Sequence, residues 1–211
     1  PGVPIVLVAG ATFTANFILD RGGVVSGTVT DAVTLLPLAG VPMTLYAHDT
    51  SDPPVEILRE TETDPSGAYR FEGLPAGRYT VLTRNGLGYA DELYGNVPCA
   101  ARAGFWDLWA GAGTPVDVTL GATASGRDFA LEPGARVTGT ITDVMTLSPL
   151  TSACVYILRV SSGVVSAAAF DCADGTGRYD AGGLPAGTYY VWVQRFSDSA
   201  TAPPATWTAR S

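Results

Sequence analysis

The sequence predicts an all-β fold made of two tandem β-sandwich modules. Its 211 residues include 25 glycines and 15 prolines among many valines and threonines, which is typical of short strands joined by tight turns. No stretch shows the apolar period of a helix, and one set of motifs occurs twice. An apolar content of 46% is enough for two modest cores, so disorder is not expected.

The repeated motifs follow one another in the same order in both halves of the chain. Residues 27–31 (GTVTD) return 112 positions later as residues 139–143 (GTITD). Three more pairs match: Pro37-Leu38 with Pro149-Leu150, residues 67–69 with 177–179, and the GLPAG blocks at 73–77 and 183–187. In each GLPAG block the proline and glycine favour a tight turn. The strands that follow are expected to face a core with Tyr79 and Val81, and with Tyr189 and Val191.

The combined pattern resembles that of bacterial carboxypeptidase-regulatory-like and collagen-adhesin B-type domains. In the first copy it reads GTVTD, PLAGV, D-x-x-G-x-Y and GLPAG-x-Y. The resemblance covers nearly the whole chain and implies tandem Ig-like, prealbumin-like sandwiches of about seven strands each. Such modules mostly act as stalks, spacers and adhesion units. Leu35 and Leu147 stand where the family usually has glycine, so we expect another type of turn there.

The first 20 residues match the end of a module and not its beginning. Residues 4–12 (PIVLVAGAT) match residues 115–123 (PVDVTLGAT), and residues 17–19 (FIL) match residues 129–131 (FAL). The second module reaches Ser211 before any counterpart of residues 115–131. We therefore expect residues 1–20 to be closing strands of a preceding or neighbouring module, 21–132 to form the first module, and 133–211 to form a second module that lacks its last strands.

A sandwich without its last strands exposes a core slot and an unpaired edge. In one interpretation the chain is a mature or excised piece of a longer tandem array, as its start at Pro1 also suggests. In another, the N-terminal segment of one subunit completes the second module of the next through Ile5, Leu7 and Phe17, with Trp207 as a further subunit contact. In a third, residues 3–20 fold back on the first module.

Two of the three cysteines are expected to form a disulfide. Cys154 and Cys172 flank a candidate hairpin centred on residues 161–163, and opposing the two cysteines puts both sulfurs on one face. The same register opposes Tyr156 to Phe170 and Leu158 to Ala168. A bridge implies an oxidising, extracellular setting, whereas two buried thiols are the alternative. Cys99 has no evident partner, which leaves a free thiol or an intermolecular bridge.

No catalytic or cofactor-binding motif is present, so we expect neither an enzyme nor a cofactor. His48, in a polar loop, is the only histidine, and a hydrolase would need a positioned base. The acidic segments at 64–67 and 174–177 supply too few carboxylates for calcium and fit tight turns instead. The chain contains no lysine, which excludes the isopeptide crosslinks and sortase coupling that the resemblance would otherwise suggest.

Charge and hydropathy exclude two classes of partner. The net charge of −8 leaves no basic face for nucleic acid. No apolar run approaches the ~20 residues of a membrane span, so membrane insertion is not expected.

We expect a non-catalytic structural repeat of a secreted or cell-surface protein. A filament subunit assembled by strand exchange is one form of this role, with other copies of the chain or adjacent repeats as partners. A carbohydrate-binding or adhesion module is an alternative, because Phe105, Trp106 and Trp109 gather aromatic rings in a segment that is surplus to the fold, with Tyr94 as a further candidate contact. Burial of these rings as a local lid competes with glycan binding. A spacer fragment of a larger secreted enzyme is the remaining alternative.

Overall fold

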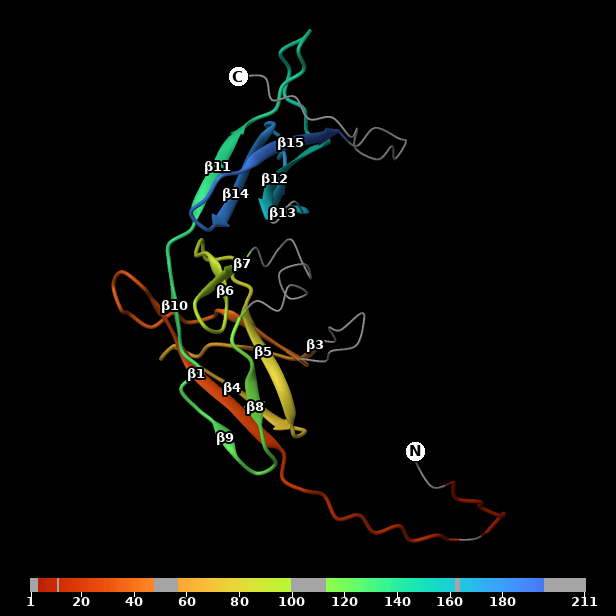
Figure 1. Cartoon of the computed structure of the whole chain (residues 1–211). Coiled ribbons are helices and arrows are strands. Elements are labelled where there is room, and N and C mark those ends of the chain that lie inside the picture. The colour runs from red at the N-terminus through yellow and green to blue at the C-terminus, as the bar shows by residue number, and fades with distance from the viewer. Residues whose placement is uncertain (1–3, 11, 48–56, 100–112, 162–163, 196–211) are drawn as a thin grey trace.

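Strands alone make up the regular structure. The computed structural model describes residues 4–10, 12–47, 57–99, 113–161 and 164–195. This part of the chain forms fifteen strands and no helix, which confirms the all-β prediction. It accordingly contains no apolar helix of membrane-spanning length. Figure 1 shows the strands grouped into two modules, one above the other, with the segment from β10 to β11 between them.

The first module is a sandwich of two sheets. One sheet has the order β10-β1-β4, and β9 also pairs with β1. Its strands are β1 (Gly23–Asp31), β4 (Ala68–Leu74), β9 (Thr123–Ala124) and β10 (Phe129–Leu131). The other sheet has the order β3-β2-β5-β6-β7, with β8 beside β5. Its strands are β2 (Pro42–Ala47), β3 (Ile57–Glu62), β5 (Gly77–Thr83), β6 (Asp91–Leu93), β7 (Val97–Cys99) and β8 (Val116–Val118).

Alternate residues of the two sheets meet in one apolar core. Along β1, Val25 and Val29 are fully buried while Thr28 between them is exposed, as expected of a half-buried strand. Tyr79 and Val81 of β5 are buried in the same core, which confirms their predicted orientation. The other buried members are Val41, Met43, Leu45, Tyr69, Phe71, Leu74, Val116, Val118, Phe129 and Leu131.

The second module repeats β1 to β5 of the first. Its strands are β11 (Ala135–Thr140), β12 (Ala153–Ser161), β13 (Val164–Cys172), β14 (Arg178–Leu184) and β15 (Tyr190–Arg195). Ala135 opposes Leu184 and Val137 opposes Ala181, just as Gly23 opposes Leu74 and Val25 opposes Phe71, with a register shift at the same place. The repeat found in the sequence is thus a repeat of strand pairing.

The first residues of the second module contact the first module. Pro133 forms an isolated antiparallel bridge with Tyr89, and the Gly134 amide donates a hydrogen bond of 2.8 Å to the Gly88 carbonyl. These contacts link residues just after the predicted boundary to the first module. The position of the boundary at residue 133 therefore stays a prediction.

Both modules carry the same loop after their first strand. The amides of Val33 and Thr34 donate to Asp31 Oδ1, both at 2.7 Å, and the Leu35 amide donates to the Asp31 carbonyl at 2.9 Å. Asp143 accepts the corresponding bonds from Met145, Thr146 and Leu147. Leu35 and Leu147 have φ of 60° and 56°. The expectation of another turn type is therefore wrong: both leucines adopt the left-handed conformation that glycine favours, because the aspartate holds the loop closed around them.

Replacing Leu35 by glycine is expected to stabilise the first module by about 0.5–1 kcal/mol. The left-handed conformation costs a non-glycine residue about 1–2 kcal/mol, part of which glycine returns through its greater entropy in the unfolded chain. Little packing is lost, because Leu35 is 73% exposed. The neighbouring Leu36→Gly variant is the matched control, since Leu36 is also exposed but does not have a positive φ. Urea unfolding in which Leu35→Gly is no more stable than Leu36→Gly would contradict this account of the loop.

Candidate functional site at the open edges of the second module

Three short strands close the sandwich of the first module. Strand β8 pairs antiparallel with β5, whereas β9 and β10 pair parallel with β1. Val116, Val118, Phe129 and Leu131 of these strands are at most 4% exposed. One continuous segment, residues 115–131, therefore supplies edge strands to both sheets and fills the core between them.

Side-chain contacts lock the closing segment in place. The Tyr69 hydroxyl donates to the Arg127 carbonyl, and the Tyr69 ring meets Phe129 edge to face at 6.1 Å. The Thr28 amide and hydroxyl both donate to Asp128 Oδ1, at 2.8 and 2.9 Å. A Cβ at Gly27 would lie 2.2 Å from the Arg127 carbonyl oxygen, so the passing backbone requires glycine there.

Among the described residues, the second module has no counterpart of these closing strands. Strand β11 pairs only with β14, and β15 pairs only with β12. The prediction that Val191 faces a closed core is wrong for this reason. Val191 is 50% exposed and Tyr189 is only partly buried, whereas Val81 and Tyr79 of the first module are fully buried.

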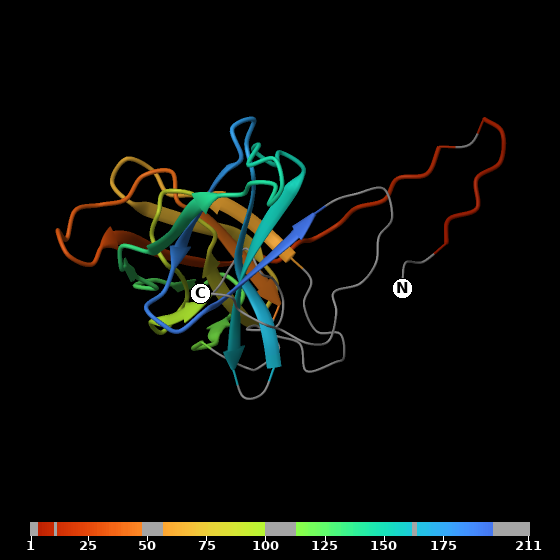
Figure 2. The same ribbon diagram turned by 90° about the horizontal axis from the view of Figure 1, so that it is seen from above.

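The described part of the N-terminal segment, residues 4–10 and 12–22, forms no strand and leaves its large apolar side chains exposed. Ile5 is 48% exposed, Leu7 64% and Phe17 81%, and Leu19, which matches Leu131, is 86% exposed. Figures 1 and 2 show this segment running away from the first module in both views. The interpretation in which residues 3–20 fold back on the first module is therefore wrong. Trp207 lies outside the described residues.

One local conformation of the closing segment is already present in the N-terminal segment. Ala9 and Gly10 form a turn in which Gly10 has φ of 83°. The matching Leu120 and Gly121 form a turn in which Gly121 has φ of 72°. The sequence match between the two segments thus extends to backbone conformation at the glycine that requires it.

The two acidic loops are turns, as the sequence predicts. Asp64 Oδ1 accepts the amides of Ser66 and Ala68 at 2.8 and 3.0 Å, and Asp174 Oδ1 accepts those of Thr176 and Arg178 at 2.7 and 3.0 Å. The Ser66 and Thr176 hydroxyls also donate to these carboxylates, and together with the amide bonds they favour the ionised form and lower the pKa of both carboxyl groups. The carboxylates are thus engaged by their own loops, and no group of three metal-ligating side chains occurs in the described ranges.

The aromatic patch suggested by the sequence is described only at Tyr94. Its ring is partly buried, meets Phe129 edge to face at 6.0 Å and lies under the Arg127 guanidinium at 5.5 Å. Packing thus accounts for Tyr94 without a glycan. Phe105, Trp106, Trp109 and His48 lie outside the described residues.

A family model matches the first module together with its closing strands. The model of the carboxypeptidase regulatory-like domain covers residues 24–132, just over half of the 211 residues. The chain belongs to this family. The match runs from β1 through β10, so residues 115–131 are part of the regulatory-like domain. No curated protein matches the chain in sequence.

Several solved structures are distantly similar. A streptococcal ancillary pilin is 18% identical with a TM-score of 0.40, and the match covers 83% of this chain and 54% of the pilin, about half its length. The minor pilin of Streptococcus agalactiae is 16% identical with a TM-score of 0.35, covering 83% and 84%. A shaft pilin of Lactobacillus rhamnosus GG is 15% identical with a TM-score of 0.31, covering 85% and 89%.

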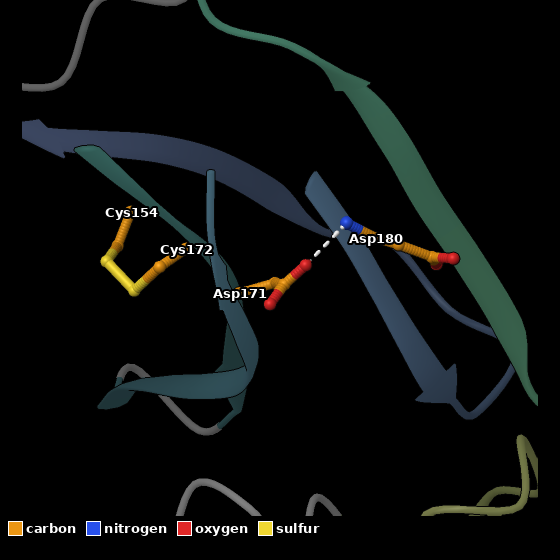
Figure 3. The surroundings of a disulfide bond; sticks show 4 residues. All are labelled: Cys154, Asp171, Cys172 and Asp180. Atoms are coloured by element: carbon orange, nitrogen blue, oxygen red, sulfur yellow. Dashed lines mark hydrogen bonds between the residues drawn. A yellow bond between two sulfur atoms is a disulfide. The ribbon is translucent and has the colours of Figure 1, made fainter. Parts of the chain in front are cut away.

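A disulfide lies in the second module. Cys154 and Cys172 oppose each other on β12 and β13 and are bonded through their sulfurs. Figure 3 shows this bridge beside Asp171, whose carboxylate accepts a hydrogen bond of 2.6 Å from the Asp180 amide of β14. Strand β13 is therefore tied both to its hairpin partner and to the other sheet of the module.

The predicted register of this hairpin holds only on one side of an irregularity. Tyr156 opposes Phe170 as expected, and the two rings stack at 6.0 Å. Leu158 opposes Ala167 and not Ala168, because the register shifts between Ile157 and Leu158. The extra residue is Ala168 of β13, and because residues 167–169 are all alanine, the sequence does not show where the alternation is interrupted.

Cys99 lies in a small buried cluster of the first module. It is 3% exposed and packs with Tyr46, Leu82 and Leu93. Such burial does not favour the intermolecular bridge that the sequence left open.

Two acidic side chains of β6 are also buried in the first module. Asp91 Oδ1 accepts hydrogen bonds from Thr83 Oγ1, at 3.1 Å, and from the Asn85 amide and side chain, both at 2.7 Å. Burial nevertheless raises the pKa of Asp91 to about 6, and burial together with the charge of Glu132 raises the pKa of Glu92 to about 7. The hydrogen bonds of Asp91 fix the loop that follows β5, which is a structural role.

Opening the disulfide is expected to lower the free energy of unfolding of the second module by about 2–3 kcal/mol. The bridge closes a loop with a sequence separation of 18, and a loop of this size gains stability in that range by restricting the unfolded chain. The Cys154→Ala/Cys172→Ala variant and its parent should be compared by denaturant unfolding. The first module has no disulfide among its described residues, so its transition serves as the internal control. An unchanged second-module transition would mean that the bridge does not support this hairpin.

Proposed function

We propose that this chain is a non-catalytic structural repeat of an extracellular surface protein, and that neighbouring copies are joined by strand exchange. Residues 4–19 of one copy close the second module of the next. The supporting observation is that one chain contains both an unused closing-strand sequence and a module whose described part lacks closing strands. The N-terminal segment carries a closing-strand sequence with its apolar side chains exposed, while the second module has two sheet edges without closing strands in its described part.

The composition of the segment suits this role. Ile5 and Leu7 correspond to the buried Val116 and Val118 of the first module. Moving one large aliphatic or aromatic side chain from water into a core stabilises an assembly by about 1.5–3 kcal/mol. Main-chain pairing along both edges adds hydrogen bonds to this apolar contact. The strand edges are then covered and no longer exposed to unspecific pairing.

The setting that fits these features is outside the cell. A disulfide of this kind persists in oxidising surroundings. The acidic surface, with a net charge of −8, suits a soluble exterior. A structural role is also consistent with the regulatory-like domain family, whose fold by itself carries no catalytic group.

Exchange of this kind produces an open polymer. The donating segment and the accepting module are different surfaces of one chain, so the contact is head to tail and does not close on itself as a twofold contact does. Apolar burial and main-chain pairing are only weakly screened by salt. The polymer should therefore persist at high ionic strength and on dilution.

Deletion of residues 1–19 is expected to abolish polymerisation, because the second module then has no donor. Electron microscopy and light scattering of the purified chain at high concentration should show filaments for the full sequence and monomers for the deletion variant. A synthetic peptide of residues 1–19 should bind the deletion variant as a capped monomer, and a scrambled peptide of the same composition is the control. Filaments formed by the deletion variant, or a full-length chain that stays monomeric at high concentration, would overturn the proposal.

A further inference from the structure

We infer that a single N-terminal segment closes both sheets of the second module of a neighbouring copy, in the register that the closing strands use in the first module. Ile5 then lies opposite Tyr189 beside β15, and Phe17 lies opposite Ile141 at the end of β11. This inference rests on the proposed function and makes it specific, because it names the paired residues and the direction of each strand.

The first half of the register follows from β8. In the first module Val116 pairs antiparallel with Tyr79, and Val118 pairs with Gly77. The corresponding residues are Tyr189 and Gly187 in the second module and Ile5 and Leu7 in the segment. The stretch that β8 would pair with, residues 187–189, leads into β15, belongs to no strand and has no strand partner in the described part of the chain. The segment thus enters antiparallel to this stretch and lengthens the sheet at the start of β15, with Ile5 and Leu7 directed into the core as Val116 and Val118 are.

The outward-facing pair supports this alignment independently of the apolar residues. In the first module Arg78 Nε donates to Asp117 Oδ1 at 2.9 Å across β5 and β8, and both side chains are exposed. The corresponding residues are Thr188 and Val6. The new pair thus lacks both the arginine and the aspartate of the first module. Pairing Thr188 with Val6 therefore leaves no single charge without its opposite on the neighbouring strand.

The second half of the register follows from β10. Phe129 pairs parallel with Val29, and Leu131 pairs with Asp31. The corresponding residues are Ile141 and Asp143 in the second module and Phe17 and Leu19 in the segment. Ile141 is only partly buried in the open module, whereas Val29 is fully buried beneath Phe129. Phe17 would restore this cover.

Polar and aromatic partners for the second half are also present. Asn16 precedes Phe17 as Asp128 precedes Phe129, and an amide oxygen can accept the same bonds from Thr140 that Asp128 accepts from Thr28. Tyr179 has the strand position of Tyr69, whose ring meets Phe129 in the first module. In the open module the Tyr179 ring lies over Gly139, where the Arg127 backbone passes over Gly27 in the first module, so the ring must turn toward Phe17 when the segment binds. The segment therefore carries partners for the contacts of the closing strands as well as their hydrophobic pattern.

The connection between the two halves has nearly the same length. The turn at Gly10 corresponds to the turn at Gly121, and both glycines have positive φ. Four residues separate Thr12 from Phe17, and five separate Thr123 from Phe129. The longer link contains Gly126, where an added Cβ would have no atom within 4 Å. A link shortened by one residue at this open position leaves both halves of the register unchanged.

Cysteine pairs on the outward face test the register without removing core side chains. One copy carries Val6→Cys and the other Thr188→Cys for the β15 edge; Ile18→Cys and Thr142→Cys serve the β11 edge. All four positions are exposed in the isolated chain. The matched control is Val8→Cys with Thr188→Cys, a slip of two residues on the same face. Mild oxidation of full-length chains, followed by mass spectrometry, identifies the linked peptides.

Each outcome bears on the register or on the exchange itself. The inferred register predicts that both in-register pairs link, with on the order of tenfold more product than the slipped pair. Filaments in which the slipped pair links as well as the in-register pair would overturn the register but leave strand exchange standing. Filaments in which only one of the two edges links would overturn closure of both sheets by one segment. Chains that neither link nor assemble would overturn the proposed exchange as well.

Discussion

Main-chain pairing at the outer edges of β1 and β5 is the constraint on which the rest of the structure depends. Each of these strands lies against the core with one face, and a short closing strand must cover its edge before the core is sealed. The closing strands are short, yet their side chains Val116, Phe129 and Leu131 are completely or almost completely buried. The first module is therefore a sandwich whose last segment covers the edges of both sheets.

The chain contains two copies of one strand arrangement, the first with its closing strands and the second without them in its described part. The pairing of β11 with β14 repeats that of β1 with β4 residue by residue, including its irregularity. The half-buried Val137 and Ile141 correspond to the fully buried Val25 and Val29. The difference in burial lies where the described part of the second module has no counterparts of the closing strands, so the two copies share one fold.

The features that could be predicted from the sequence are those set by local chemistry. Turn residues such as Gly67 and Gly177, the repeated motifs and the opposition of Cys154 to Cys172 all follow from spacing and residue type. The offset of the N-terminal segment was also readable, because its apolar alternation matches a strand of the same chain.

Features that depend on competing local preferences or on distant groups could not be predicted. The left-handed conformation of Leu35 requires the hydrogen bonds of Asp31, which outweigh a leucine's preference. The bulge at Ala168 lies within three consecutive alanines, so the types of side chain along β13 do not reveal it. Val191 has the pattern of a core residue, but its exposure is decided by strands that lie elsewhere. The burial of Tyr94 likewise depends on Phe129 and Arg127, which are remote in sequence.

Hydrogen–deuterium exchange at the strand edges tests the central claim most directly. It compares the amides of residues 187–189 and 139–143 in assembled chains and in dissociated monomers, with residues 77–79 and 27–31 of the same molecules as the closed reference. External closure predicts strong protection of the second-module edges only in the assembly, while the first-module edges stay protected in both states. Equal protection of the second-module edges in monomer and assembly would contradict the claim that this module is completed from outside.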